Sequence, residues 1–184
     1  MDVVVFHSMW GLRPTEVAAA DRLRALTAPA ELEAGFALMG EIGWSTIARR
    51  AYDALHQATD DAVLIGFSMG VGVISQVWPD RIAAAAVACL HAPASVPLGV
   101  RRGTPVQLHY AAGDRFAPPA QVAEFRRTAE AAAAAAIVRE YEGAGHYFTD
   151  ESHPDYNAVA AAGAWSDVLD MLQSLPAGGE PCGR

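Results

Sequence analysis

Three polar side chains of this sequence have the types that together perform nucleophilic catalysis. They are Ser68, Asp114 and His146, in this order along the chain. A serine hydroxyl attacks a carbonyl group only when a base takes its proton, and an imidazole has a suitable pKa near neutrality. A carboxylate fixes the tautomer of that imidazole and stabilises the imidazolium that forms. The three residue types therefore predict acyl chemistry through a covalent intermediate.

The serine lies in a glycine-rich stretch, Gly-Phe-Ser-Met-Gly at 66–70, which fits the pattern G-x-S-x-G. An apolar run at 62–65 precedes it and a helical pattern follows, which is the context of a nucleophile elbow. Side chains two residues to either side of the serine would collide in so tight a turn, so we expect Gly66 and Gly70 to provide clearance. The pattern alone is loose, and a plain glycine-rich turn is the alternative.

Asp114 and His146 each follow a predicted strand, as Ser68 does. The strands are expected at 105–111 and 137–141. Because the carboxyl ends of parallel strands lie at one edge of a sheet, the three side chains can converge there. Taken singly, Asp114 can be an ordinary turn aspartate and His146 a loop histidine. Three matches at three strand ends favour a catalytic triad.

The elements that must position these residues alternate along the chain. Alternating strand and helix patterns predict an α/β fold with a mainly parallel sheet and helices on both faces. Further strands are expected at 3–6 and 82–90. Helices are expected after Pro14, from a cap at Ser45 or Thr46 to Leu55, and at 71–77, 121–136 and 157–175.

Length and composition narrow the class of protein. The 184 residues suit one domain over 1–176 followed by a flexible tail at 177–184. The net charge of -8, without a basic cluster longer than two arginines, argues against binding to nucleic acid or to an anionic membrane. We see no signal peptide and no membrane span, so a cytoplasmic protein is expected. Cys89 and Cys182 offer neither a disulfide framework nor metal-ligand spacing, so no metal is expected.

The developing oxyanion of an acyl reaction needs two N–H donors. The N–H of Met69, directly after the serine, is one candidate. The loop after the first strand should supply the other, with Met9 as first choice and Trp10 as second. Trp10 and Phe116 are candidates for apolar walls around a substrate, and ordinary packing is the alternative for both.

On these residues the chain resembles the dienelactone hydrolase family of α/β-hydrolases, which share the order serine, aspartate, histidine. The matching stretches are 3–12, Gly-Phe-Ser-Met-Gly at 66–70, Gly-Asp-Arg-Phe-Ala-Pro at 113–118 and Tyr-Glu-Gly-Ala-Gly-His-Tyr-Phe-Thr-Asp at 141–150. The resemblance implies a three-layer sandwich that hydrolyses esters or lactones through an acyl-enzyme, without a cofactor. It places the nucleophile on Ser68, the acid on Asp114, the base on His146 and the oxyanion amides on Met9 and Met69.

Two departures from the family matter. Its founding enzymes carry a cysteine nucleophile and a glutamate in the first loop, where this chain has Ser68 and Ser8. The segment 26–32 is too short for the strand that usually follows the first helix, so we expect a minimal sheet of about five to six strands that can lack one edge strand. An uncovered first strand invites pairing, so we expect a homodimer or a covering segment.

The leading hypothesis is thus a serine hydrolase of small carboxylic esters or lactones. Two alternatives remain open. One is a binding or regulatory module that keeps the hydrolase fold without catalysis, and the other is an acyltransferase that uses the same three residues.

Overall fold

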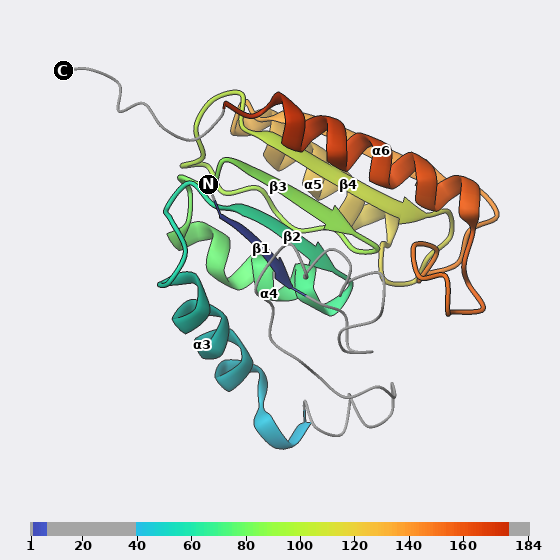
Figure 1. The fold of residues 1–184 in the computed structure, drawn as a ribbon, viewed down its shortest axis with the longest axis horizontal. Helices are drawn as coiled ribbons and strands as arrows, with labels where there is room; N and C mark the ends of the chain where they lie inside the picture. The colour runs from blue at the N-terminus through green and yellow to red at the C-terminus, as the bar shows by residue number, and fades with distance from the viewer. Residues whose placement is uncertain (1, 7–39, 177–184) are drawn as a thin grey trace.

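The computed structural model describes residues 2–6 and 40–176, which form a parallel sheet between layers of helices (Figure 1). The five described strands lie in the order β1-β2-β3-β4-β5, and every neighbouring pair is parallel. The strands are β1 (Val3–Phe6), β2 (Val63–Phe67), β3 (Ala86–Leu90), β4 (Pro105–Ala111) and β5 (Ala135–Tyr141). The helices are α3 (Trp44–Leu55), α4 (Met69–Val77), α5 (Pro119–Ala131) and α6 (Ala158–Ser174), with a short 3-10 helix, η1 (Trp78–Asp80), after α4.

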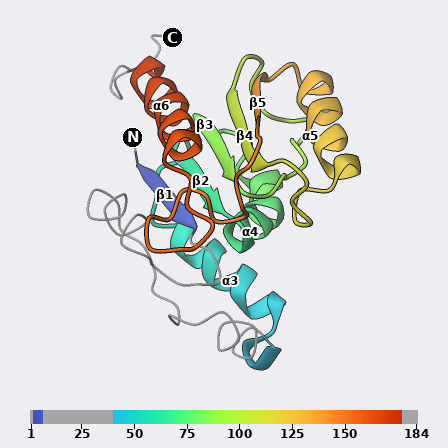
Figure 2. The ribbon, with the colours of Figure 1, turned by 90° about the vertical axis from the view of Figure 1, so that its right-hand side faces the viewer.

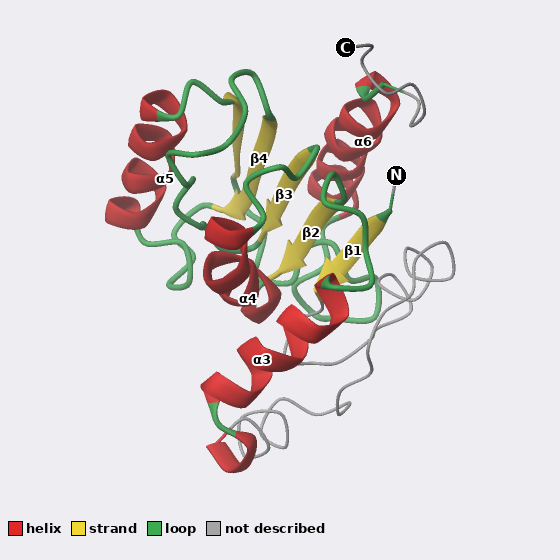
Figure 3. Ribbon diagram, turned by 90° about the vertical axis from the view of Figure 1, so that its left-hand side faces the viewer, coloured by secondary structure: helices red, strands yellow, loops and turns green. Residues whose placement is uncertain are grey.

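Both faces of the sheet are covered. Helices α3, α4 and α5 lie on one face and α6 on the other (Figures 2 and 3). Successive side chains of a strand point to opposite faces, and β2 shows this directly. Leu64 packs into the cluster that includes Val71 of α4, whereas Ile65 packs with Met171 of α6. Every residue of β2 and β3 is buried, as expected for central strands of a three-layer α/β fold.

The fold class predicted from the sequence is confirmed. The strands expected at 3–6 and 105–111 are found with those bounds. The closing helix expected at 157–175 is α6, with Asn157 as its N-cap. The first helix, the segment 26–32 and the tail at 177–184 lie outside the described residues. The exposed first edge and the homodimer therefore remain predictions.

Three element boundaries were predicted wrongly. The helix expected at 121–136 ends at Ala131, and β5 begins at Ala135, so both boundaries lie within a run of six alanines at 131–136. Ala133 has φ 52, and its carbonyl accepts the Gly103 N–H, so the turn into the sheet outweighs the helix propensity of alanine. The strand expected at 82–90 begins only at Ala86, after a turn in which the Ala84 N–H donates to Arg81.

The third boundary is the start of α3. Its N-cap is Gly43, not Ser45 or Thr46, and no side chain caps the helix. Gly43 has φ 76, and its carbonyl accepts the N–H groups of Thr46 and Ile47. The described helices include none that is both long and apolar enough to cross a membrane.

Candidate active site

Ser68 occupies a strained turn between β2 and α4. Its backbone has φ 49 and ψ -109, a conformation that residues with a side chain seldom adopt. Two backbone hydrogen bonds hold it there. The Ser68 N–H donates to the carbonyl of Leu90 at 2.9 Å, and the N–H of Val71 donates to the Ser68 carbonyl at 2.9 Å. Backbone strain of this kind costs on the order of 1–3 kcal/mol and collects at functional sites.

Gly66 provides the clearance that the sequence predicts. A Cβ at this position would lie 2.7 Å from Cδ1 of Ile74 and 2.9 Å from the backbone nitrogen of Val71. Gly72 has a similar but milder role, since a Cβ there would lie 3.2 Å from the Trp44 ring. Glycine therefore lets β2, α4 and α3 approach one another closely behind the serine.

The three side chains that the sequence singled out meet at the carboxyl edge of the sheet. The Ser68 Oγ and the His146 Nε2 are 2.8 Å apart, and the His146 Nδ1 and the Asp114 Oδ2 are 2.5 Å apart. An ionised carboxylate only accepts hydrogen bonds, so the His146 Nδ1–H must donate to Asp114. A neutral ring then has its lone pair on Nε2, facing the serine hydroxyl. This is the arrangement in which an imidazole acts as a base.

The turn after β4 holds Asp114 rigidly. The carboxylate side chain is only 3% exposed. Its Oδ1 accepts the N–H of Phe116 at 2.9 Å, and its backbone carbonyl accepts the N–H of Ala117 at 3.0 Å. Gly113 before it has φ 73, which a glycine adopts without strain. Both oxygens of Asp114 are thus occupied, one by its own turn and one by His146.

His146 lies in the loop between β5 and α6. This loop packs against its own residues. A Cβ at Gly145 would lie 2.4 Å from Cγ of Asp155, so only glycine lets Asp155 fold against the backbone beside His146. The Asp155 Oδ2 accepts the Tyr147 N–H at 3.2 Å. The glycine next to His146 is therefore required by packing within the loop.

Aromatic rings surround His146. The ring centroids of Phe116 and Tyr147 each lie 4.5 Å from its own. Phe116 is 39% exposed, and the Arg115 guanidinium lies 4.6 Å above its ring centroid. Phe116 thus lies beside His146 at the solvent side of the site, and its role as a substrate wall remains a prediction.

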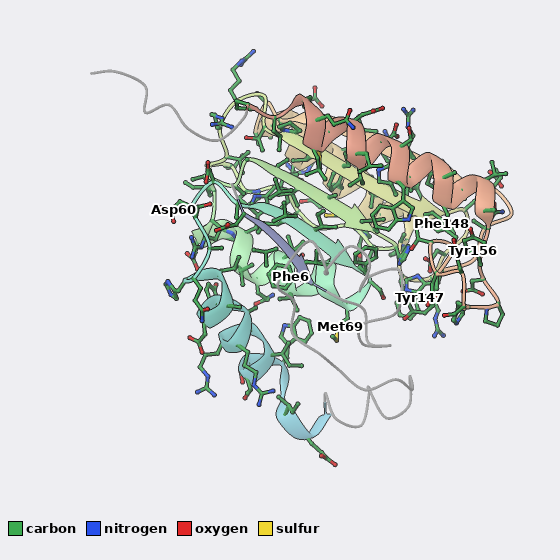
Figure 4. All side chains as sticks on the ribbon, in the orientation of Figure 1. Phe6, Asp60, Met69, Tyr147, Phe148 and Tyr156 are labelled. Atoms are coloured by element: carbon green, nitrogen blue, oxygen red, sulfur yellow. The ribbon has the colours of Figure 1, made fainter. Side chains whose placement is uncertain are left out.

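Met69 begins α4, so its N–H lies in the first turn, where helix geometry provides no intrahelical acceptor. Figure 4 shows Met69 and Tyr147 at the end of the sheet to which the strands point. The two other residues proposed around the oxyanion and the substrate, Met9 and Trp10, lie outside the described residues. Of the two N–H groups expected to hold the oxyanion, Met69 is thus the one that belongs to a described residue, and both assignments remain predictions.

The sequence analysis missed one residue at this edge, His91. It directly follows β3, so the same signal that identified the other three applied to it. Its side chain is 2% exposed, and its ring centroid lies 5.6 Å from that of His146. Its Nε2 lies 2.9 Å from the Thr149 Oγ1.

The described residues contain no group of three His, Cys, Asp or Glu side chains that is arranged to hold a metal ion. Burial raises the pKa of the Cys89 thiol to about 12, so this thiol stays protonated at neutral pH. Ser68 is therefore the nucleophile that the geometry favours.

Comparison with known proteins gives a consistent picture. The fold matches a dienelactone hydrolase-like promiscuous phosphotriesterase from metagenomic libraries at 20% identity, covering 95% of this chain and 86% of that one, with a TM-score of 0.73. It also matches a phospholipase/carboxylesterase from Dyadobacter fermentans at 15% identity, covering 91% and 89%, with a TM-score of 0.54. Among curated proteins, no significant sequence match is found.

Likeness at such low identity shows a shared fold and no more. The sequence profile of the dienelactone hydrolase family is more informative, because it matches residues 28–175. That range contains Ser68, Asp114 and His146, and it spans most of the chain. The chain therefore belongs to the dienelactone hydrolase family, which supports a hydrolase of the esterase type.

Proposed function

We propose that this protein is a serine hydrolase that cleaves small carboxylic esters or lactones through an acyl-enzyme. The observation that carries the proposal is the continuous chain of hydrogen bonds from the Ser68 hydroxyl through His146 to Asp114. Its geometry matches what a nucleophile, a base and an orienting acid require.

In the first half of the reaction, His146 Nε2 takes the proton of Ser68 as the Oγ attacks the substrate carbonyl. The positive charge that forms on the imidazole is stabilised by the buried Asp114 carboxylate. The tetrahedral intermediate then collapses, and His146 returns the proton to the leaving alcohol or to the ring oxygen of a lactone. Ser68 is left as an ester of the substrate acid.

In the second half, His146 takes a proton from a water molecule as that water attacks the acyl-enzyme. His146 then returns the proton to the Ser68 Oγ as the bond to the acyl group breaks and the acid is released. In both halves the negative charge on the carbonyl oxygen needs donors that are already in place. The N–H of Met69 suits this role because it begins α4, whose amino-terminal end carries a partial positive charge. Met9 remains the candidate for the second donor.

The experiment that tests the proposal compares two serines of the same segment. Ser68→Ala should abolish labelling by a fluorophosphonate probe and reduce hydrolysis of p-nitrophenyl acetate to background. The matched control is Ser75→Ala, which removes a hydroxyl of α4 that donates to the carbonyl of Val71. This control should keep both activities. Full hydrolysis by Ser68→Ala would refute the assignment.

The same assay separates the two alternatives. If the natural protein neither reacts with the probe nor cleaves any member of a panel of esters and lactones, the fold serves binding or regulation. If an added alcohol or amine captures the acyl group in preference to water, the protein is an acyltransferase. Hydrolysis and acyl transfer both use Ser68, Asp114 and His146 in the same roles.

A further inference from the structure

The end of β3 carries a buried histidine whose hydrogen bonding is incomplete. His91 is 2% exposed, and its Nδ1 has no hydrogen-bond partner among the described residues. A buried polar atom without a partner costs stability that an apolar side chain of similar size would not lose. The backbone adds a second cost, because His91 has φ 73.

His91 lies between the two segments whose relative position the proposed reaction depends on, the turn of Ser68 and the loop of His146. The residue before it, Leu90, accepts the N–H of Ser68, so β3 ends against the turn that holds the nucleophile. Its side chain reaches the other segment, the loop after β5, through the 2.9 Å contact between Nε2 and the Thr149 hydroxyl. His91 therefore links the loop of His146 to the strand end beside Ser68.

The ring of His91 also supports the ring of His146 from the buried side. Of the rings around His146, Phe116 is 39% exposed, whereas His91 is almost fully covered. An edge-on contact with Phe148, at 5.1 Å between centroids, fixes the orientation of the His91 ring. His91, the neighbour of His146 on the buried side, is thus held in three ways. Its ring contacts Phe148, its Nε2 contacts Thr149, and its backbone continues β3.

His91 must stay neutral for this arrangement to work, and its surroundings keep it so. Burial is the main cause that lowers its pKa, and His146, His109 and His153 act in the same direction against Asp150. A neutral ring does not compete with His146 for the positive charge that forms when Ser68 gives up its proton. The imidazolium therefore remains on the ring that contacts Asp114.

We propose that His91 is a positioning residue for His146, holding its ring and its loop against the turn of Ser68. The proposal rests on the proposed ester hydrolysis, since it concerns the base of that reaction. It predicts an effect on the rate of the chemical step and little effect on substrate binding.

The chain offers a matched control in His109, a second buried histidine, on the adjacent strand β4. Its ring stacks on Tyr141 instead of His146, and its two nitrogens lie 2.9 and 3.0 Å from Tyr141 and Gln107. The same substitution at both positions therefore removes a buried imidazole in each case. Only at His91 does it remove support from His146.

The first measurement is steady-state kinetics on p-nitrophenyl acetate. His91→Gln should lower kcat about 10- to 100-fold with KM changed less than twofold, because a small misplacement of a catalytic group costs this much. His109→Gln should keep kcat within about twofold, even where its melting temperature falls. Thr149→Val, which keeps the shape of the side chain but removes its hydroxyl, should lower kcat about 3- to 10-fold. The double variant should lose no more than His91→Gln alone, since both changes act through one contact.

The second measurement needs no substrate. The proton between His146 Nδ1 and Asp114 should give a low-field resonance in the NMR spectrum of the free protein. We expect this signal to broaden or vanish in His91→Gln and Thr149→Val and to persist in His109→Gln. The two readouts distinguish failure of this proposal from failure of the proposed function. If no ester is cleaved but the signal is lost in His91→Gln, the proposed role of His91 is supported and the proposed ester hydrolysis is refuted.

The proposal is overturned if folded His91→Gln and Thr149→Val keep both kcat and the resonance. It is also overturned if His109→Gln loses as much kcat as His91→Gln, because the effect would then be general loss of structure. Should His91→Gln fail to fold, Thr149→Val and its resonance decide the question alone.

Discussion

Two polar clusters of this protein each contain a buried histidine, but they differ in how completely that histidine is hydrogen-bonded. One lies along strands β4 and β5, beneath α6, and we call it the strand cluster. The other lies at the carboxyl edge of the sheet, and we call it the edge cluster. The strand cluster consists of Gln107, His109 and Tyr141, and the edge cluster of Ser68, His91, Asp114, His146 and Thr149.

Every side chain of the strand cluster has its partners. His109 lies between Tyr141 and Gln107, and the Gln107 amide donates to the carbonyl of Asp167 in α6 at 2.9 Å. Burial raises the pKa of the Tyr141 hydroxyl to about 12, so it stays protonated and can donate. The cluster therefore fastens α6 to the sheet.

The edge cluster, in contrast, is strained and incompletely paired. Ser68 and His91 both have positive φ, and the His91 Nδ1 has no partner among the described residues. A cluster that served only stability would have no need of either feature. The difference teaches that a buried histidine by itself does not indicate function, whereas strain and an unpaired nitrogen beside a serine–histidine–aspartate chain do.

Apart from the loss of Ser68 itself, the largest effect should come from changing the edge cluster at Asp114. In Asp114→Asn the amide nitrogen would face His146 Nδ1 and force the proton of the ring onto Nε2, so that the ring no longer accepts from Ser68. We expect kcat to fall on the order of 10⁴-fold. The Oδ1 that accepts the Phe116 N–H is kept, so the melting temperature should change little.

The control for this variant is Asp80→Asn, which changes a carboxylate bonded to Tyr52 on the surface. It should leave kcat unaltered. Activity of Asp114→Asn within tenfold of the natural protein would contradict the role given to Asp114.

The strand cluster should make the stability of the fold depend on pH. Burial lowers the pKa of His109 from 6.5 to about 4. Above pH 6.5 the ring is neutral in both the folded and the unfolded chain, so it contributes no pH dependence. Below pH 6.5 the unfolded chain takes up a proton first, and the folded state loses stability until the pH approaches 4. This amounts to about 3 kcal/mol.

Urea unfolding of the natural protein and of His109→Gln at pH 7, 6, 5 and 4.5 measures this contribution. The natural protein should lose more of its free energy of unfolding than the variant does over this range, whatever their difference at pH 7. His91 adds to the loss in both proteins in the same direction, because its pKa is also lowered. Equal losses in the two proteins would show that His109 is not the group responsible.

The sequence was sufficient for the parts of the fold that depend on local pattern. The apolar run before Ser68 and the glycines around it predicted β2, the tight turn and α4. Asp114 and His146 were found because parallel strands end at one edge, so a polar residue after a strand is a strong positional signal. The same signal applies to His91, which directly follows the strand expected at 82–90.

The alanine run at 131–136 shows what the sequence could not predict. Alanine favours a helix in isolation, but Ala135 and Ala136 pair with Pro105 and Val106 in the sheet. This pairing joins residues about thirty positions apart, so no local pattern reveals it. The hydrogen bond of His91 to Thr149 and the folding of Asp155 onto Gly145 were hidden for the same reason.

The smallest effect we predict concerns a residue that serves stability although it borders the His146 loop. Asn157 caps α6, and its side-chain oxygen accepts the Ala160 N–H at 3.1 Å. Asn157→Ala should lower the free energy of unfolding by about 1 kcal/mol. Asn157→Asp should lose less, because a carboxylate accepts the same bond and interacts favourably with the helix dipole, although it cannot donate to the Gly143 carbonyl as the Asn157 amide does at 3.5 Å. Both variants keep the backbone bond from the N–H of residue 157 to the carbonyl of Phe148, so kcat should stay within twofold.

Thermal unfolding and ester kinetics on the two variants measure these effects on stability and on kcat. A tenfold loss of kcat at unchanged stability would show that Asn157, at the start of α6, acts with the edge cluster in catalysis and does not serve stability alone.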